Sequence, residues 1–132
     1  VTPAVNQVET HVYCQQIRAG KYMDEFGTKT MSWGPLAEGR NGLFTDKTLT
    51  EIGREHGRSA AQVALRYLTQ RDVIIIPKSV RRERMAENFS IYDFELTPDE
   101  MVRIESLDTA QSLFFDHNGP ETVKMFMGWR NL

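Results

Sequence analysis

The stretch V-I-I-I-P-K-S, residues 73–79, decides the fold class. Its first four positions are apolar without alternation, and Pro77 ends the run. Parallel strands have this composition when helices cover both faces of their sheet, because no solvent face is left for polar residues. The stretch therefore predicts a strand over residues 73–76 that is buried on both faces, in an α/β protein.

The chain on the N-terminal side of this strand alternates between strand and helix patterns. Residues 4–9 and 30–33 are predicted strands. Two i,i+4 pairs of apolar side chains predict a helix over residues 14–26, and Gly27 suits the left-handed position just past its end. The pairs are Tyr13 with Ile17 and Tyr22 with Phe26.

Residues 34–47 are predicted to form a loop, since their glycines leave too much backbone freedom for a helix or strand. A helix is predicted over residues 49–56. Two capping boxes mark the starts of two further helices. They are Ser59 with Gln62, and Thr97 with Glu100, the second with Pro98 in its first turn. Strands that alternate with helices in this way predict a parallel sheet, but three parallel strands leave two open edges.

Composition excludes several classes of protein. The 132 residues carry 16 Lys and Arg against 18 Asp and Glu, a net charge of −2, which argues against a nucleic acid or an anionic membrane as partner. The longest apolar run is four residues, too short to cross a membrane. Cys14 is the only cysteine, as fits the cytoplasm. The opening V-T-P-A-V resembles a cut inside a longer chain, and we expect a fragment.

Two predicted strand ends carry anion-binding chemistry. Gly34 opens a glycine-rich loop whose backbone N–H groups could approach a phosphate. Lys78 and Ser79 stand just before an expected helix N-terminus, where the helix dipole favours an anion. This spacing suggests a cofactor or substrate that bears phosphate.

Plainer interpretations remain open for the same residues. Lys78 could be a solvated loop lysine, and the arginines of residues 81–84 a charged helix face. Trp33 could belong to the core, and Gln7 could be a polar residue satisfied inside a barrel. No metal site is predicted, because the three histidines are far apart and only one cysteine is present.

Five segments together resemble the C-terminal part of the aldo-keto reductase family, and in particular bacterial enzymes of the 2,5-diketo-D-gluconate reductase type. The segments are A-V-N-Q-V-E-T-H (4–11), S-W-G-P-L-A-E-G (32–39), A-A-Q-V-A-L-R-Y-L (60–68), I-P-K-S-V-R-R-E-R-M-A-E-N (76–88) and S-L-F-F-D-H (112–117). The family fold is a TIM-type (β/α)8 barrel. The resemblance implies that residues 1–132 are its strands 6–8 with their helices and tail, an incomplete barrel.

The resemblance also implies a set of residues that bind NADPH. Gln7 would hold the nicotinamide carboxamide, and Trp33 would stack on the nicotinamide ring. The loop after Trp33, with Gly34 and Leu36, would fold over the pyrophosphate. The residues around the adenosine 2′-phosphate would be Lys78, Ser79, Val80 and Arg84. Glu87 and Asn88 would contact adenine. Phe114, Phe115 and the following tail would shape the substrate pocket.

The family's catalytic Asp, Tyr, Lys and His come from its first four strands, so the resemblance implies no catalytic residue in this chain. The expected function is that of a fragment of an NADPH-dependent reductase that converts aldehydes, ketones or sugar-derived dicarbonyls to alcohols. The 132 residues alone are expected to be inactive. Their expected partner is the missing half of the barrel or a second copy. The alternative is a non-catalytic NADPH-binding or regulatory module.

Overall fold

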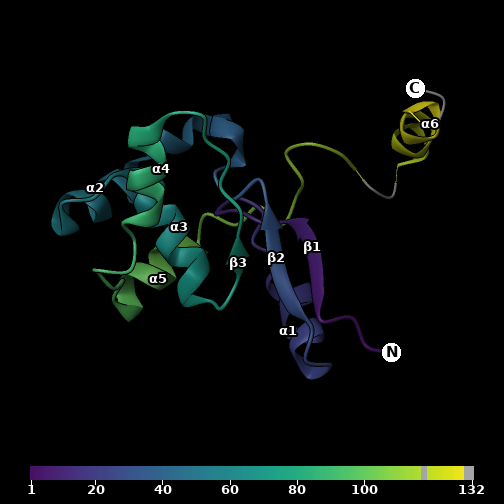
Figure 1. Cartoon of the computed structure of the whole chain (residues 1–132), viewed down its shortest axis with the longest axis horizontal. Helices are drawn as coiled ribbons and strands as arrows, with labels where there is room; N and C mark the ends of the chain where they lie inside the picture. Colours follow the sequence, from purple (N-terminus) through teal and green to yellow (C-terminus); the bar gives the residue numbers. More distant parts are fainter. Residues whose placement is uncertain (117–118, 130–132) are drawn as a thin grey trace.

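The computed structural model describes residues 1–116 and 119–129 and contains one parallel sheet (Figure 1). Its strands are β1 (Val5–Glu9), β2 (Lys29–Trp33) and β3 (Ile74–Ile75), in the order β1-β2-β3. The register aligns Gln7 with Met31, and Met31 with Ile74. The chain therefore has the α/β architecture with a parallel sheet that the sequence predicts.

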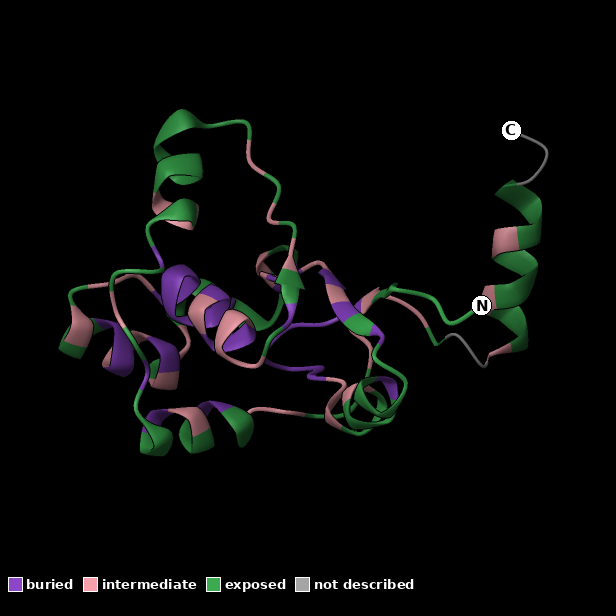
Figure 2. Ribbon diagram, turned by 60° about the horizontal axis from the view of Figure 1, so that its bottom comes forward, coloured by how far each residue is buried: buried purple, intermediate pink, exposed green. Residues whose placement is uncertain are grey.

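Helices follow each strand, and those after β2 and β3 gather beside β3, while the last helix stands apart (Figure 1). They are α1 (Ile17–Glu25), the 3-10 segment η1 (Ala37–Thr45), α2 (Lys47–His56), α3 (Ala60–Gln70), α4 (Arg82–Phe89), α5 (Pro98–Glu105) and α6 (Pro120–Trp129). Buried residues concentrate along α3, whereas α4 and α6 are exposed over most of their length (Figure 2). None of the helices described is long and apolar enough to cross a membrane.

The two faces of the sheet have different surroundings. On one face Asn6 donates to Met23 of α1 at 3.3 Å, and its neighbour Thr30 is buried. On the other face Gln7 is exposed, and Ile74 is 39% exposed. No helix among the described residues packs on this second face, so the sheet is covered on one side only.

The prediction of a fully buried strand over residues 73–76 is therefore wrong in this chain. Val73 is buried, but only Ile74 and Ile75 pair with β2, and Ile74 and Ile76 lie on the open face. An uninterrupted apolar run predicts that both faces need cover. Residues 1–116 and 119–129 supply cover for one of them.

The first helix begins later than predicted, at Ile17 in place of residue 14. His11 and Cys14 pair through their backbones in a tight turn, and Gln16 has a left-handed φ of 52°. Tyr13 is buried in the core, so its spacing from Ile17 reflects tertiary packing and not a helix face. The other pair is confirmed: the rings of Tyr22 and Phe26 are 5.1 Å apart.

The local signals for the later helices are largely confirmed. Both capping boxes form, at Ser59 with Gln62 and at Thr97 with Glu100. The helix predicted over residues 49–56 begins at Lys47, because Asp46 accepts from the Leu49 N–H at 3.0 Å. No helix is predicted from the sequence in the tail, where the structure has α6.

Candidate functional site

A cavity of about 440 Å³ lies where η1, the start of α3 and α4 meet. Its lining includes six of the residues predicted to bind the cofactor, drawn from segments up to 52 positions apart. They are Leu36, Lys78, Ser79, Arg84, Glu87 and Asn88. The structure therefore joins the loop after β2 and the segment after β3 in one concave site.

Two cations face this cavity without a carboxylate partner. Lys78 and Arg84 form no ion pair among the residues described, whereas Glu87 is already engaged by the Ser59 hydroxyl. α4 begins beside them with no side-chain cap on its first N–H groups. Uncapped backbone donors together with unpaired cations favour an anion such as phosphate.

Two predicted phosphate contacts differ from the rest in their geometry. Val80 is 88% exposed and is not part of the cavity lining, so the structure does not bring its side chain into the site. The Ser79 hydroxyl accepts from the Arg81 N–H at 3.2 Å, in a turn that leads into α4. Ser79 therefore shapes the segment before α4 as well as lining the cavity.

Two other predicted cofactor residues, Gln7 and Trp33, line a second and larger cavity of about 1030 Å³ along the edge of β1. The Gln7 amide Nε2 donates to the Met31 sulfur at 3.3 Å. Glu9, two residues beyond Gln7, is the register partner of Trp33. A side-chain amide and an indole ring therefore stand near the C-terminal ends of adjacent strands.

The tail packs aromatic rings against Trp33. Phe114 meets the indole edge to face at 5.0 Å between centroids, and Phe115 lies 6.3 Å away. Gly34 has a φ of +66°, and a Cβ there would lie 3.8 Å from the Phe114 ring. The structure thus brings both predicted substrate-pocket residues to the ring predicted to stack on nicotinamide. His117, the last residue of the matching tail motif, lies outside the described residues.

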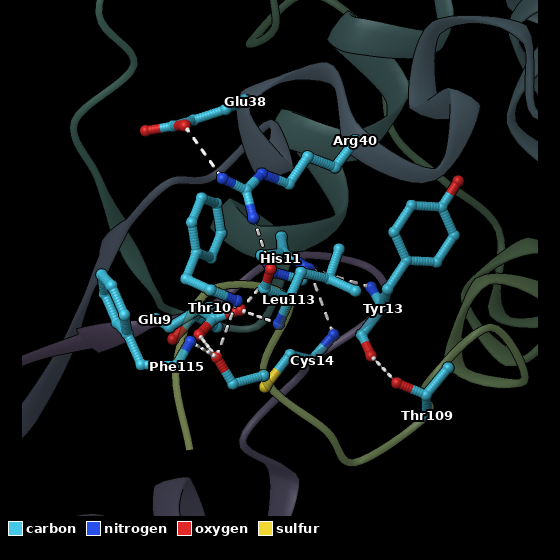
Figure 3. Close-up of polar contacts among 12 residues, drawn as sticks. Glu9, Thr10, His11, Tyr13, Cys14, Glu38, Arg40, Thr109, Leu113 and Phe115 are labelled. Carbon is cyan, nitrogen blue, oxygen red and sulfur yellow. Dashed lines mark hydrogen bonds and ion pairs between the residues drawn. The ribbon is translucent and has the colours of Figure 1, made fainter. Parts of the chain in front are cut away.

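A buried carboxylate holds this tail in place (Figure 3). One oxygen of Glu9 accepts from the Leu113 N–H at 2.9 Å, and the other from the Ser112 hydroxyl. His11 lies 2.8 Å from the same carboxylate and is fully buried. Burial lowers the pKa of His11 below its usual value, although the hydrogen bond and charge of Glu9 act in the opposite direction.

Arg40 of η1 makes the second contact with the tail. Its guanidinium donates to the Leu113 carbonyl at 2.5 Å and lies over the Phe114 ring, 4.2 Å from the centroid. Neither Glu9 nor Arg40 is among the site residues predicted from the sequence. Both stand within or beside the motifs that carry the resemblance, but each acts on residues more than 70 positions away, which no local pattern reveals.

Two buried tyrosines lie outside both cavities, whereas Lys21 and Tyr22 line the second one. Burial raises the pKa of both Tyr13 and Tyr67 to about 12, and neither lines the two cavities described above. Over residues 1–116 and 119–129 no group of three His, Cys, Asp or Glu side chains could hold a metal ion. The arrangement can bind an anion and a planar ring.

Comparison with protein families matches residues 1–109 to the Aldo/keto reductase family. Methylglyoxal reductase DkgA of Salmonella typhimurium is 38% identical over 113 residues, which are 86% of this chain and 41% of that protein. The chain thus spans about two fifths of the length of that relative.

Solved structures give the same match. An aldo-keto reductase enzyme from a Medee basin deep-sea metagenome library superposes with a TM-score of 0.86 at 32% identity, over 90% of this chain and 44% of that one. A mutant of Gox0644 in complex with NADPH has a TM-score of 0.78 at 39% identity, over 82% of this chain and 39% of the other.

Proposed function

The chain belongs to the aldo/keto reductase family, and we propose that it forms the cofactor-binding part of an NADPH-dependent reductase that converts small carbonyl compounds to alcohols. Aldehydes, ketones and sugar-derived dicarbonyls are the proposed substrates. The relative named methylglyoxal reductase and the solved relative in complex with NADPH support this choice.

The cavity lined by Lys78 and Arg84 is the observation that carries the proposal. Both cations lack an ion-pair partner among the described residues, and they lie beside the uncapped start of α4. NADPH differs from NADH by a 2′-phosphate, and a guanidinium can fork onto phosphate oxygens and keeps its charge. We assign Lys78, Ser79 and Arg84 to this phosphate, and Glu87 and Asn88 to the adenine.

The second cavity would receive the nicotinamide end. Gln7 offers both a donor and an acceptor to a carboxamide, and Trp33 offers a flat face to a ring. Bound NADPH would supply a hydride to the carbonyl carbon. Gly34 and Leu36 would contact the pyrophosphate, and Val80 would contribute through its backbone. Phe114 and Phe115 would limit the space open to the carbonyl compound.

We further propose that residues 1–132 are strands 6–8, with their helices and tail, of a (β/α)8 barrel, since such a barrel takes about 250 residues. The open face of the sheet supports this, because in a barrel that face would line the interior. The proton donor would then come from outside residues 1–132, which alone would not turn over substrate.

The proposed function is tested by exchanging Arg84 for Ala in the protein that carries this chain. Loss of a charged hydrogen-bond partner should weaken NADPH binding roughly 10- to 100-fold and change NADH binding less than about twofold. Binding is measured by fluorescence quenching or calorimetry. Arg82→Ala removes an equal charge from the same helix outside the cavity and is the matched control. Equal losses for both nucleotides would refute the 2′-phosphate assignment.

The alternative, a non-catalytic NADPH-binding or regulatory module, is distinguished by turnover. NADPH consumption with a dicarbonyl compound is measured alongside NADPH binding. The reductase proposal requires both in the complete protein and binding at most in residues 1–132. Binding without turnover in the complete protein would favour the regulatory module, and turnover by residues 1–132 alone would show that the chain contains a proton donor.

A further inference from the structure

The η1 segment faces two sites at once. Leu36, Glu38 and Gly39 form part of the wall of the cavity that contains Lys78 and Arg84. Arg40, the next residue, contacts the tail at Leu113 (Figure 3) and also at Phe114. Consecutive residues therefore join the proposed nucleotide cavity to the aromatic wall beside Trp33.

The contact of Arg40 with the tail combines two interactions of one planar group. One nitrogen donates to the Leu113 carbonyl at 2.5 Å, while the guanidinium carbon lies 4.2 Å from the Phe114 centroid. Glu38 lies 4.0 Å from another guanidinium nitrogen. Half of the side chain remains exposed, so the contact forms at a surface and not in the core.

The backbone on both sides of Arg40 is anchored. Ala37 and Leu43 are fully buried, and the Tyr13 hydroxyl donates to the Asn41 carbonyl at 3.4 Å. The backbone turns sharply here, with left-handed φ values at Glu38 and Gly39 before Arg40 and at Asn41 and Gly42 after it. The backbone that carries Arg40 is therefore held on both sides.

The tail is anchored at its base as well. Glu9 holds the Ser112 hydroxyl and the Leu113 N–H, so residues 112 and 113 have fixed positions on the end of β1. Phe114 lies one residue beyond this anchor. Its ring contacts Arg40, Trp33 and His11, and Arg40 is the one of these three that belongs to η1.

We propose that Arg40 is a positioning residue that couples the nucleotide cavity to the carbonyl site: a nucleotide bound against η1 fixes Phe114 over Trp33 through the Arg40 guanidinium. This inference rests on the proposed function, because it takes the two cavities as nucleotide and carbonyl sites. By linkage, a carbonyl compound packed against Phe114 strengthens nucleotide binding by the same factor.

Adenosine 2′,5′-bisphosphate is the probe that tests the coupling, because it carries the adenosine 2′-phosphate but no nicotinamide to touch Trp33. Phenylalanine is replaced by 4-fluorophenylalanine in the protein that carries this chain, and the Phe114 signal is assigned by Phe114→Leu. We expect the compound to shift and sharpen the Phe114 fluorine resonance in the unaltered protein. In Arg40→Ala the compound should still bind and leave that resonance unchanged.

Two further variants separate positioning from folding. Arg40→Lys keeps a donor and a cation and should restore part of the fluorine response, whereas Arg54→Ala removes an exposed arginine from α2 and should respond like the unaltered protein. In steady-state kinetics Arg40→Ala should raise KM for a dicarbonyl about tenfold with kcat within about twofold, since one charged hydrogen bond and one cation–π contact are lost.

The outcomes are distinguishable. A fluorine shift of equal size in Arg40→Ala and in the unaltered protein, with the compound bound to both, would overturn the coupling and leave the proposed function standing. Failure of the unaltered protein to bind adenosine 2′,5′-bisphosphate would overturn the proposed function and the coupling with it.

Discussion

His11 is a fully buried histidine whose neighbours determine its tautomer. Its Nδ1 accepts from the N–H groups of Tyr13 and Cys14, both at 3.2 Å, so Nδ1 carries no proton. Nε2 therefore carries the proton and donates to Glu9 at 2.8 Å. A second proton on the ring would face two backbone donors. The neutral ring supports the Glu9 carboxylate that holds the tail.

This arrangement predicts a loss of stability in mild acid. Burial lowers the pKa of His11 below 6.5, so the unfolded chain takes up a proton before the folded one as the pH falls. The free energy of unfolding should decrease below about pH 6.5, by at most about 1.4 kcal/mol per pH unit from this group. Urea denaturation between pH 5 and 8 measures this change.

His11→Asn is the variant for that prediction, because an amide oxygen can accept from the same N–H groups but does not titrate in this range. It should unfold more easily at pH 8 and lose the additional decline below pH 6.5. If the unaltered protein and His11→Asn declined in parallel between pH 6.5 and 5, His11 would not be the group responsible.

At the scale of elements, the α2–α3 corner is a tight backbone contact near the cavity that contains Lys78 and Arg84. The Gly53 carbonyl accepts from the Arg58 N–H at 2.7 Å, and a Cβ on Gly53 would lie 2.4 Å from the Arg58 carbonyl oxygen. Gly57 makes the turn between them with a φ of +63°. This corner places Ser59 and Ala60 at the start of α3, where both line the cavity.

Gly53→Ala should therefore destabilise the fold by about 1–3 kcal/mol, because the Arg58 backbone would have to move. Gly20→Ala is the control: it also lies within a helix, but its nearest neighbour would be Thr30 Oγ1 at 3.9 Å. Alanine loses less backbone conformational entropy on folding than glycine does, so that variant should be neutral or more stable by roughly 0.5–1 kcal/mol. Thermal denaturation compares the two variants. Equal effects would show that the Arg58 backbone can move at little cost in stability.

For the whole molecule, the open face of the sheet is the dominant feature. Val5 and Ile76 on this face are 40% and 46% exposed, and β1 and β3 are its two edges. Apolar side chains on an uncovered sheet with free edges promote association. In the proposed barrel the same side chains would be interior.

We predict that residues 1–132 expressed alone associate and bind an apolar dye. The double variant Ile74→Thr with Ile76→Thr should reduce both effects at least about twofold, because it removes apolar area from the open face. Val102→Thr alters a 65% exposed side chain on α5 and should change neither. Size-exclusion chromatography and dye fluorescence measure the outcome. A compact monomer without dye binding would refute the prediction.

Local signals in the sequence were sufficient to predict much of the fold. The capping boxes at Ser59 and Thr97 and the left-handed Gly27 depend on neighbours within four residues, and all appear as predicted. The residues of the candidate site could also be predicted from the sequence, because Lys78, Arg84, Trp33 and Gln7 stand in motifs that resemble one family. Their roles toward NADPH stay predictions until binding is measured.

The sequence alone determined the α/β class, the capped helix starts and the residues that carry the proposed cofactor chemistry, because these depend on side-chain type and short spacing. Only the tertiary structure showed that Ile74 and Ile76 lie on an uncovered face, that Val80 points away from the cavity, and that Tyr13 belongs to the core. The contacts of Glu9 and Arg40 with the tail also appeared only there. Each depends on segments distant in the chain that meet through packing, and no local pattern encodes such a meeting.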